Sequence, residues 1–194
     1  MKNLTASDRS ALIRLASSLP VGSEERRAIL AGLAQAKVAA GDVNVPGKHI
    51  LDNAKVTRNA KVYDNAKVSG RAEVSNNAKV YGNAEVGGDA HVWGDAEVYG
   101  RATVTGRAWV TRNAKVSGTA YVTGDAWVDG NAKVSGGAYV NEDAYVKGDA
   151  EVSGNARVGG NAKIGGTAVI LGGRWDGSEG EIMEGRWKGP GIPA

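Results

Sequence analysis

The sequence contains no cysteine and no phenylalanine, and it has only two histidines and four prolines. Without cysteine the chain forms no disulfide, no thiolate metal site and no cysteine nucleophile. The absence of phenylalanine argues against a core built on large aromatic side chains. The apolar residues are mostly valine and alanine, so the expected core is made of small aliphatic side chains.

Long apolar runs are also missing. Residues 1–8, MKNLTASD, lack the continuous apolar stretch of a secretory signal, and no run approaches the length of a membrane-spanning helix. We therefore expect synthesis and folding in a cytoplasm, with no membrane partner. The 24 basic and 21 acidic residues are interspersed. This mixing predicts an evenly charged surface and no nucleic-acid groove.

Residues 1–40 have helical periodicity. Thr5 and Asp8 form a capping box before the first apolar stripe, Pro20 ends that segment, and Ser23 caps a second one. Two short amphipathic helices bury too little surface to be stable alone, so we expect this helical hairpin to dock on a protein partner. The expected docking residues are Leu12, Ile13, Leu15, Ile29, Leu30 and Leu33. Residues 41–49 have the Gly and Pro content of a linker.

Residues 50–172 form an array with a period of six. Alanine recurs at every sixth position from 54 to 168, and valine or isoleucine recurs two positions later. The A-x-V-x segment predicts a short strand, and the Gly-Asn or Gly-Asp pair that follows predicts a corner in which glycine adopts a positive φ. Asp64 and Asn76 are tolerated replacements for that glycine. Arg58, Arg112 and Glu142 fit the corner less well.

The outward-facing residues indicate how many repeats make one coil. Tyr63, Tyr81 and Tyr99 are spaced 18 residues apart, and so are Trp109 and Trp127. A spacing of 12 would place unlike residues over one another. Three hexads per coil therefore predict a triangular prism with one strand on each side, in which aromatic residues stack in columns. The remaining members of these columns are Tyr145, Tyr121 and Tyr139.

The repeating V-x-G-[ND]-A-x pattern resembles the hexapeptide repeat of left-handed parallel β-helices, the fold of the trimeric acyltransferase-like superfamily. The resemblance covers residues 50–172. It implies an all-β solenoid with 18-residue coils, a left-handed turn and a homotrimer. After the array, residues 173–194 contain two similar segments, GRWDG and GRWKG, around SEGEIME. They predict a C-terminal cap containing a hairpin with its turn near Gly180.

The sequence contains few candidates for catalytic or metal-binding residues. A zinc centre like that of the carbonic anhydrases in this superfamily needs three histidines, and only His49 and His91 are present. An acyltransferase would use His91 as general base. However, His91 occupies an ordinary outward position, where a solvated side chain is expected, and no loop interrupts the repeats to build a pocket. The corner aspartates are explained by turn chemistry, so we expect no metal and no cofactor.

The aromatic columns have three interpretations: they stack against sugar rings, they lie in a subunit interface, or they stiffen the sheet. The overall expectation is a non-enzymatic structural protein: a helical adaptor, a linker, a rigid shaft and a cap. This plan is similar to decoration, spike or fibre proteins of phage virions. The alternatives are an acyltransferase-like enzyme and a carbohydrate-binding module.

Overall fold

The computed structural model describes residues 50–190, the backbone of residues 192–193, and six residues nearer the N-terminus, at positions 15, 18, 19, 23, 25 and 29. The chain divides into two units, Met1–Asn44 and Val45–Ala194. In the first unit, Leu15 and Ile29 are helical. The other expected docking residues, Leu12, Ile13, Leu30 and Leu33, and the linker 41–49 lie outside the described residues.

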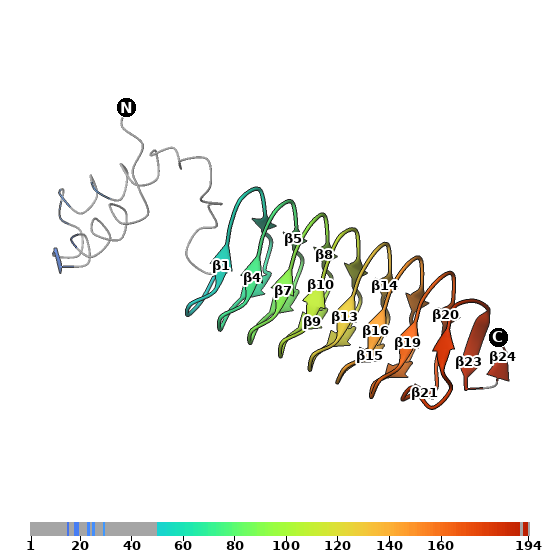
Figure 1. Ribbon diagram of the computed structural model, residues 1–194. Coiled ribbons are helices and arrows are strands. Elements are labelled where there is room, and N and C mark those ends of the chain that lie inside the picture. The colour runs from blue at the N-terminus through green and yellow to red at the C-terminus, as the bar shows by residue number, and fades with distance from the viewer. Residues whose placement is uncertain are drawn as a thin grey trace. The chain divides into compact units, whose positions relative to one another are not determined.

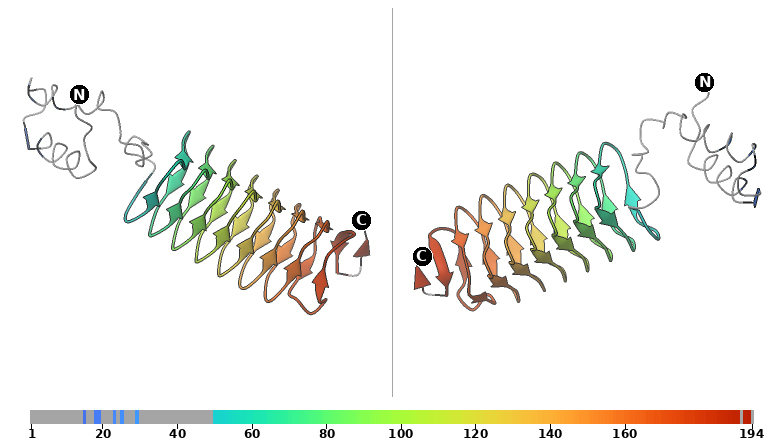
Figure 2. Two further views of the ribbon diagram at one scale, coloured as in Figure 1. Left: turned by 45° about the horizontal axis from the view of Figure 1, so that its top comes forward. Right: turned by 180° about the vertical axis from the view of Figure 1, so that it is seen from behind.

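The second unit is an all-β parallel solenoid with coils of about 18 residues, as the repeat predicts (Figure 1). Each hexad contributes one two-residue strand, formed by the valine and the residue before it. Three strands complete a coil, and equivalent strands of successive coils pair in parallel. Two further views show the same stack of coils from other directions (Figure 2).

The strands form three sheets, one on each side of the coil. Sheet 1 contains, in spatial order, β1 (Lys55–Val56), β4 (Glu73–Val74), β7 (His91–Val92), β10 (Trp109–Val110), β13 (Trp127–Val128), β16 (Tyr145–Val146), β19 (Lys163–Ile164) and β22 (Glu181–Ile182). Sheet 2 contains β2 (Lys61–Val62), β5 (Lys79–Val80), β8 (Glu97–Val98), β11 (Lys115–Val116), β14 (Lys133–Val134), β17 (Glu151–Val152), β20 (Val169–Ile170), β23 (Arg186–Gly189) and β24 (Ile192–Pro193). Sheet 3 contains β3 (Lys67–Val68), β6 (Glu85–Val86), β9 (Thr103–Val104), β12 (Tyr121–Val122), β15 (Tyr139–Val140), β18 (Arg157–Val158) and β21 (Arg174–Trp175).

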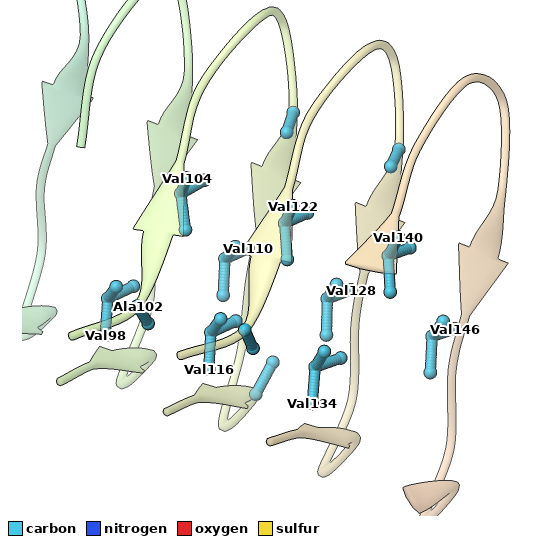
Figure 3. Close-up of a cluster of buried hydrophobic side chains, with 14 of the residues drawn as sticks. Val98, Ala102, Val104, Val110, Val116, Val122, Val128, Val134, Val140 and Val146 are labelled. Atoms are coloured by element: carbon cyan, nitrogen blue, oxygen red, sulfur yellow. The ribbon is translucent and has the colours of Figure 1, made fainter. Parts of the chain in front are cut away.

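The core is made almost entirely of alanine and valine. From Ala66 to Val158 every repeated alanine and valine is at most 1% exposed. Valines of the three sheets face one another inside each coil, as Val98, Val104 and Val110 do in Figure 3. Because the interior is narrow, small side chains fill it, which explains why the repeat has no place for phenylalanine.

The corners require a positive φ, and glycine supplies it at most of them, as at Gly118 (φ 68°). The non-glycine residues at this position have a compensating contact with an adjacent coil. The carboxylates of Asp52 and Asp64 accept hydrogen bonds from the N–H groups of Gly70 and Gly82, at 3.1 and 3.0 Å. A left-handed residue costs about 1–2 kcal/mol, and a side-chain hydrogen bond offsets part of that cost.

The three residues predicted to fit the corners less well have contacts of the same kind. Glu142 accepts a hydrogen bond from the Gly160 N–H. Arg58 donates from Nη1 to Asn76 Oδ1 at 3.1 Å, and Arg112 Nε lies 3.3 Å from Asp129 Oδ1. A corner position that looks unfavourable locally is therefore supported by its neighbour one coil away.

The expectation of a hairpin with its turn near Gly180 is wrong, and the antiparallel pair in this region is formed farther along the chain by β23 and β24. β21 and β22 do not pair with each other; each joins the preceding coil in parallel, β21 with β18 and β22 with β19. Trp175, at 1% exposed, takes the inward position that valine holds in earlier coils, and its indole contacts that of Trp187 edge-to-face. The two GRW segments thus continue the solenoid and fill its C-terminal end with tryptophan.

The corner geometry leads to a test with a matched pair of substitutions. A Cβ at Gly118 would lie 2.8 Å from the Gly136 nitrogen, whereas a Cβ at Gly180 (φ 79°) would meet no heavy atom within 4 Å. We expect Gly180→Ala to cost about 1–2 kcal/mol for the backbone conformation alone. Gly118→Ala should cost more, because the next coil must also move.

Thermal unfolding followed by circular dichroism measures both variants against the unmodified chain. If both variants lose the same stability, the contact between coils adds nothing to the cost of the positive φ.

Candidate functional site

The most distinctive surface is a column of rings on sheet 1. His91, Trp109, Trp127 and Tyr145 occupy equivalent positions on β7, β10, β13 and β16 and are in register. The ring centroids of His91 and Trp109 are 4.3 Å apart, and those of Trp109 and Trp127 are 5.5 Å apart, both stacked. Tyr145 meets Trp127 edge-to-face at 5.9 Å. We call these four residues the sheet 1 aromatic column.

Trp93, which follows β7, widens this column and was not among the predicted site residues. Its ring contacts Trp109 at 5.2 Å and His91 at 5.7 Å, both edge-to-face. Trp93 is in the position after the valine, where its neighbours at the 18-residue spacing are Ser75 and Thr111, so spacing alone gave no aromatic signal.

The expectation that His91 is a solvated side chain is correct only in part, because 27% of the side chain is exposed. The imidazole is stacked on Trp109, and its Nδ1 is buried without a hydrogen-bond partner among the described residues. Its closest carboxylate contact is Glu73 Oε2, at 3.9 Å from Nδ1. This contact is too long for a hydrogen bond that would fix the orientation of a general base.

A buried carboxylate anchors the end of the column. Asp129, 9% exposed, accepts hydrogen bonds from Thr111 Oγ1 at 2.7 Å and from the Tyr145 hydroxyl at 3.3 Å. Burial by itself raises the pKa of Asp129, but the hydrogen bonds from Thr111 and the Gly130 N–H and the charge of Arg112 outweigh it. The pKa is therefore held below its ordinary value.

The other aromatic residues stack in the columns that the 18-residue spacing predicts, but on other parts of the coil. Tyr63, Tyr81 and Tyr99 follow strands of sheet 2 and have successive ring centroids 5.0 Å apart. Tyr121 and Tyr139 stack at 5.3 Å on sheet 3. Burial, together with the charge of Glu97, raises the pKa of Tyr81 to about 12. The eight aromatic residues that were singled out therefore form three separate columns and no common pocket.

Charged residues cover the outer face of sheet 2, where lysines and glutamates pair between coils. Lys79 Nζ lies 3.0 Å from Glu97 Oε1, and Lys133 Nζ lies 2.7 Å from Glu151 Oε1. Lys115 also reaches Glu97, with Nζ 3.6 Å from Oε2. Because glutamates interrupt the lysines along it, this face carries no continuous positive stripe for a polyanion.

Within the described part of the chain, no cluster of three or more His, Cys, Asp or Glu side chains is arranged to hold a metal ion. The same residues include no helix long and apolar enough to cross a membrane. Comparisons with models of known protein families, with curated proteins and with solved structures found no match for this chain.

The Asp129 cluster predicts a pH dependence of stability. Because the folded protein holds the pKa of Asp129 below its ordinary value of 3.8, its contribution to stability is present above about pH 4 and is lost as the pH falls further. Asp129→Asn should cost about 1–2 kcal/mol at pH 7. The difference in the free energy of unfolding between the variant and the unmodified chain should become smaller as the pH falls toward 2.

Urea unfolding at a series of pH values measures this gap. Asp143→Asn, at an exposed corner, is the control for loss of one negative charge. A difference in unfolding free energy that stays constant with pH, or that Asp143→Asn also shows, would contradict the stabilising role of the Asp129 carboxylate.

Proposed function

We propose that the chain is a non-enzymatic structural protein: a rigid β-helical shaft attached through its N-terminal helices to a larger assembly. The observation that carries this proposal is the uninterrupted backbone ladder. Hydrogen bonds between successive coils run from the Leu51 N–H, 2.8 Å from Val68 O, to the Leu171 N–H, 2.8 Å from Trp187 O. No loop leaves the coils between these residues.

Regularity of this kind supports a mechanical role. Each coil adds about 4.8 Å of length, and every coil is tied to the next on all three sides. Catalytic and binding residues are disproportionately found on loops held by a rigid scaffold. A chain that extends its scaffold and builds no loops is suited to spanning a distance. A decoration, spike or fibre component of a phage virion has this requirement.

The finer assignment is to the hexapeptide-repeat β-helices, with a left-handed coil and a homotrimer. Its support is the 18-residue coil with alanine and valine turned inward at fixed positions. For the subunit contact we propose the sheet 1 aromatic column, because sheet 2 is occupied by ion pairs and Trp127 is 43% exposed. Tryptophan and tyrosine are enriched at interfaces of this kind.

An acyltransferase-like activity with His91 as base has less support. His91 is stacked in the sheet 1 aromatic column, and the hollows found on the solenoid near its C-terminal end are lined by other residues. We therefore place His91 among the residues of the subunit contact and assign it no catalytic role.

The subunit contact can be tested by sedimentation equilibrium. Trp127→Ser should shift the chain from a trimer toward smaller species, because it removes the most exposed ring of the sheet 1 aromatic column. Tyr63→Ser is the matched control, since Tyr63 is 39% exposed but belongs to another column. An unmodified chain that is monomeric, or equal effects of the two substitutions, would contradict the proposed interface.

Attachment to an assembly can be tested in particles prepared from the source organism or its infected cells. The full chain should sediment with a large particle on a density gradient. A Leu12→Ser, Leu30→Ser double variant should remain near the top of the gradient, because it removes apolar residues expected to dock. Trp175→Phe, at the opposite end of the chain, is the control and should still sediment with the particle.

If the unmodified chain sediments only as a small oligomer, the adaptor-and-shaft proposal is wrong. Circular dichroism of the double variant checks that its β-solenoid is intact, so that loss of sedimentation reports attachment and not unfolding.

A further inference from the structure

A hollow of about 190 Å³ lies on the outer side of sheet 3, where the regular coils give way to the last one. It spans three coils, near the strand labelled β21 in Figure 1. The hollow exists because Gly159 and Gly160 replace side chains that the preceding coil carries as Asn141 and Glu142. A Cβ at Gly159 would come within 2.5 Å of Asn141 Oδ1, so even one added carbon would intrude.

Two arginines form one wall of the hollow. Arg157 on β18 and Arg174 on β21 are cross-strand neighbours in register. Like charges opposite each other destabilise a sheet unless they are neutralised. Elsewhere, stacked lysines are neutralised by glutamates, as Lys115 and Lys133 are. Within the part of the chain that the structure describes, neither Arg157 nor Arg174 has a carboxylate oxygen within 4.0 Å, so the pair is prepared for an external anion.

The remaining walls supply a flat surface and hydrogen-bond acceptors. Tyr139, 37% exposed, precedes Arg157 in the same column and is held flat by stacking on Tyr121. Glu142 and Asp176 also line the hollow. Their negative charges disfavour a polyanion such as nucleic acid, but they can accept hydrogen bonds from hydroxyl groups. The hollow is smaller than the roughly 300–1,000 Å³ of sites for drug-sized ligands.

We infer that this hollow binds one carboxylate-bearing sugar unit of an acidic glycan. The guanidinium groups of Arg157 and Arg174 bind the carboxylate, because a planar fork of N–H donors matches its two oxygens. The sugar ring lies against Tyr139, and its hydroxyls donate to Glu142 and Asp176. This site is distinct from the sheet 1 aromatic column, so it leaves that face free for a subunit contact.

Isothermal titration calorimetry of the full chain tests the inference, with a galacturonate oligosaccharide as the probe. A galactose oligosaccharide of the same length and inorganic phosphate are the comparison ligands. Saturable binding of the uronate, at least tenfold tighter than either comparison ligand, is the expected result. If the neutral sugar binds equally well, the arginines do not recognise a carboxylate and the inference is wrong. If phosphate binds equally well, the site binds anions in general and does not recognise a sugar. Absence of uronate binding at concentrations up to about 10 mM, where even a site with a Kd of about 1 mM would be nearly saturated, would overturn the inference.

Two variants locate the binding. Arg157→Gln should weaken uronate binding at least tenfold, whereas Arg101→Gln, which removes the same charge at an exposed corner, should leave it unchanged. Gly159→Ala keeps both arginines but narrows the hollow, and it should also weaken binding. Circular dichroism checks that each variant is folded. Uronate binding that survives both Arg157→Gln and Gly159→Ala would show that the sugar binds elsewhere.

Discussion

Hydrogen bonds between successive coils constrain every other feature of this solenoid. On sheet 1 the Trp109 N–H lies 2.9 Å from Ala126 O, and on sheet 2 the Lys115 N–H lies 2.9 Å from Ala132 O. A parallel ladder of this kind fixes the register, so each side chain has its equivalent from the next coil directly beside it. The surface therefore consists of columns, and the properties of a face depend on which residues follow one another at intervals of one coil.

Within each column, neighbouring side chains must form favourable contacts with one another. Aromatic residues do so by stacking, as Tyr63, Tyr81 and Tyr99 do with nearly parallel rings. Asparagines donate amide hydrogens along a corner column, as from Asn113 Nδ2 to Asn131 Oδ1 at 3.0 Å. In charged columns, neighbouring lysines also have glutamate partners, as Lys115 has Glu97 and Lys133 has Glu151. Among the described residues, Arg157 and Arg174 have no carboxylate oxygen within 4.0 Å, which is the reason for assigning them a ligand that the chain itself does not provide.

The regular and irregular parts of the solenoid are suited to different roles. Between Ile50 and Leu171 the repeat provides length and stiffness, and it leaves little room for a concave site. In the last coil two of the three strand pairs are offset by 17 residues, as between Arg157 and Arg174, whereas Lys163 and Glu181 keep an offset of 18. Tryptophan replaces valine in the core there, and the glycine pair of the preceding coil, Gly159 and Gly160, opens the hollow. The departure from regularity gives this end of the molecule a recognition surface, while the proposed attachment lies at the other end of the chain.

The six-residue period by itself determined the coil, the alanine and valine core, and the aromatic columns. These follow from local pattern because a repeat places identical residues in identical surroundings. The sequence did not reveal that Arg58, Arg112 and Glu142 fit their corners, because the contacts that support them come from a coil 18 residues away. The stacking of His91 and the anchoring of Asp129 likewise depend on neighbours in adjacent coils. At the C-terminus, two similar segments suggested a hairpin. Only the tertiary structure decided otherwise, because the open end of an apolar core gains more from covering by tryptophan than a short isolated hairpin gains from pairing with itself.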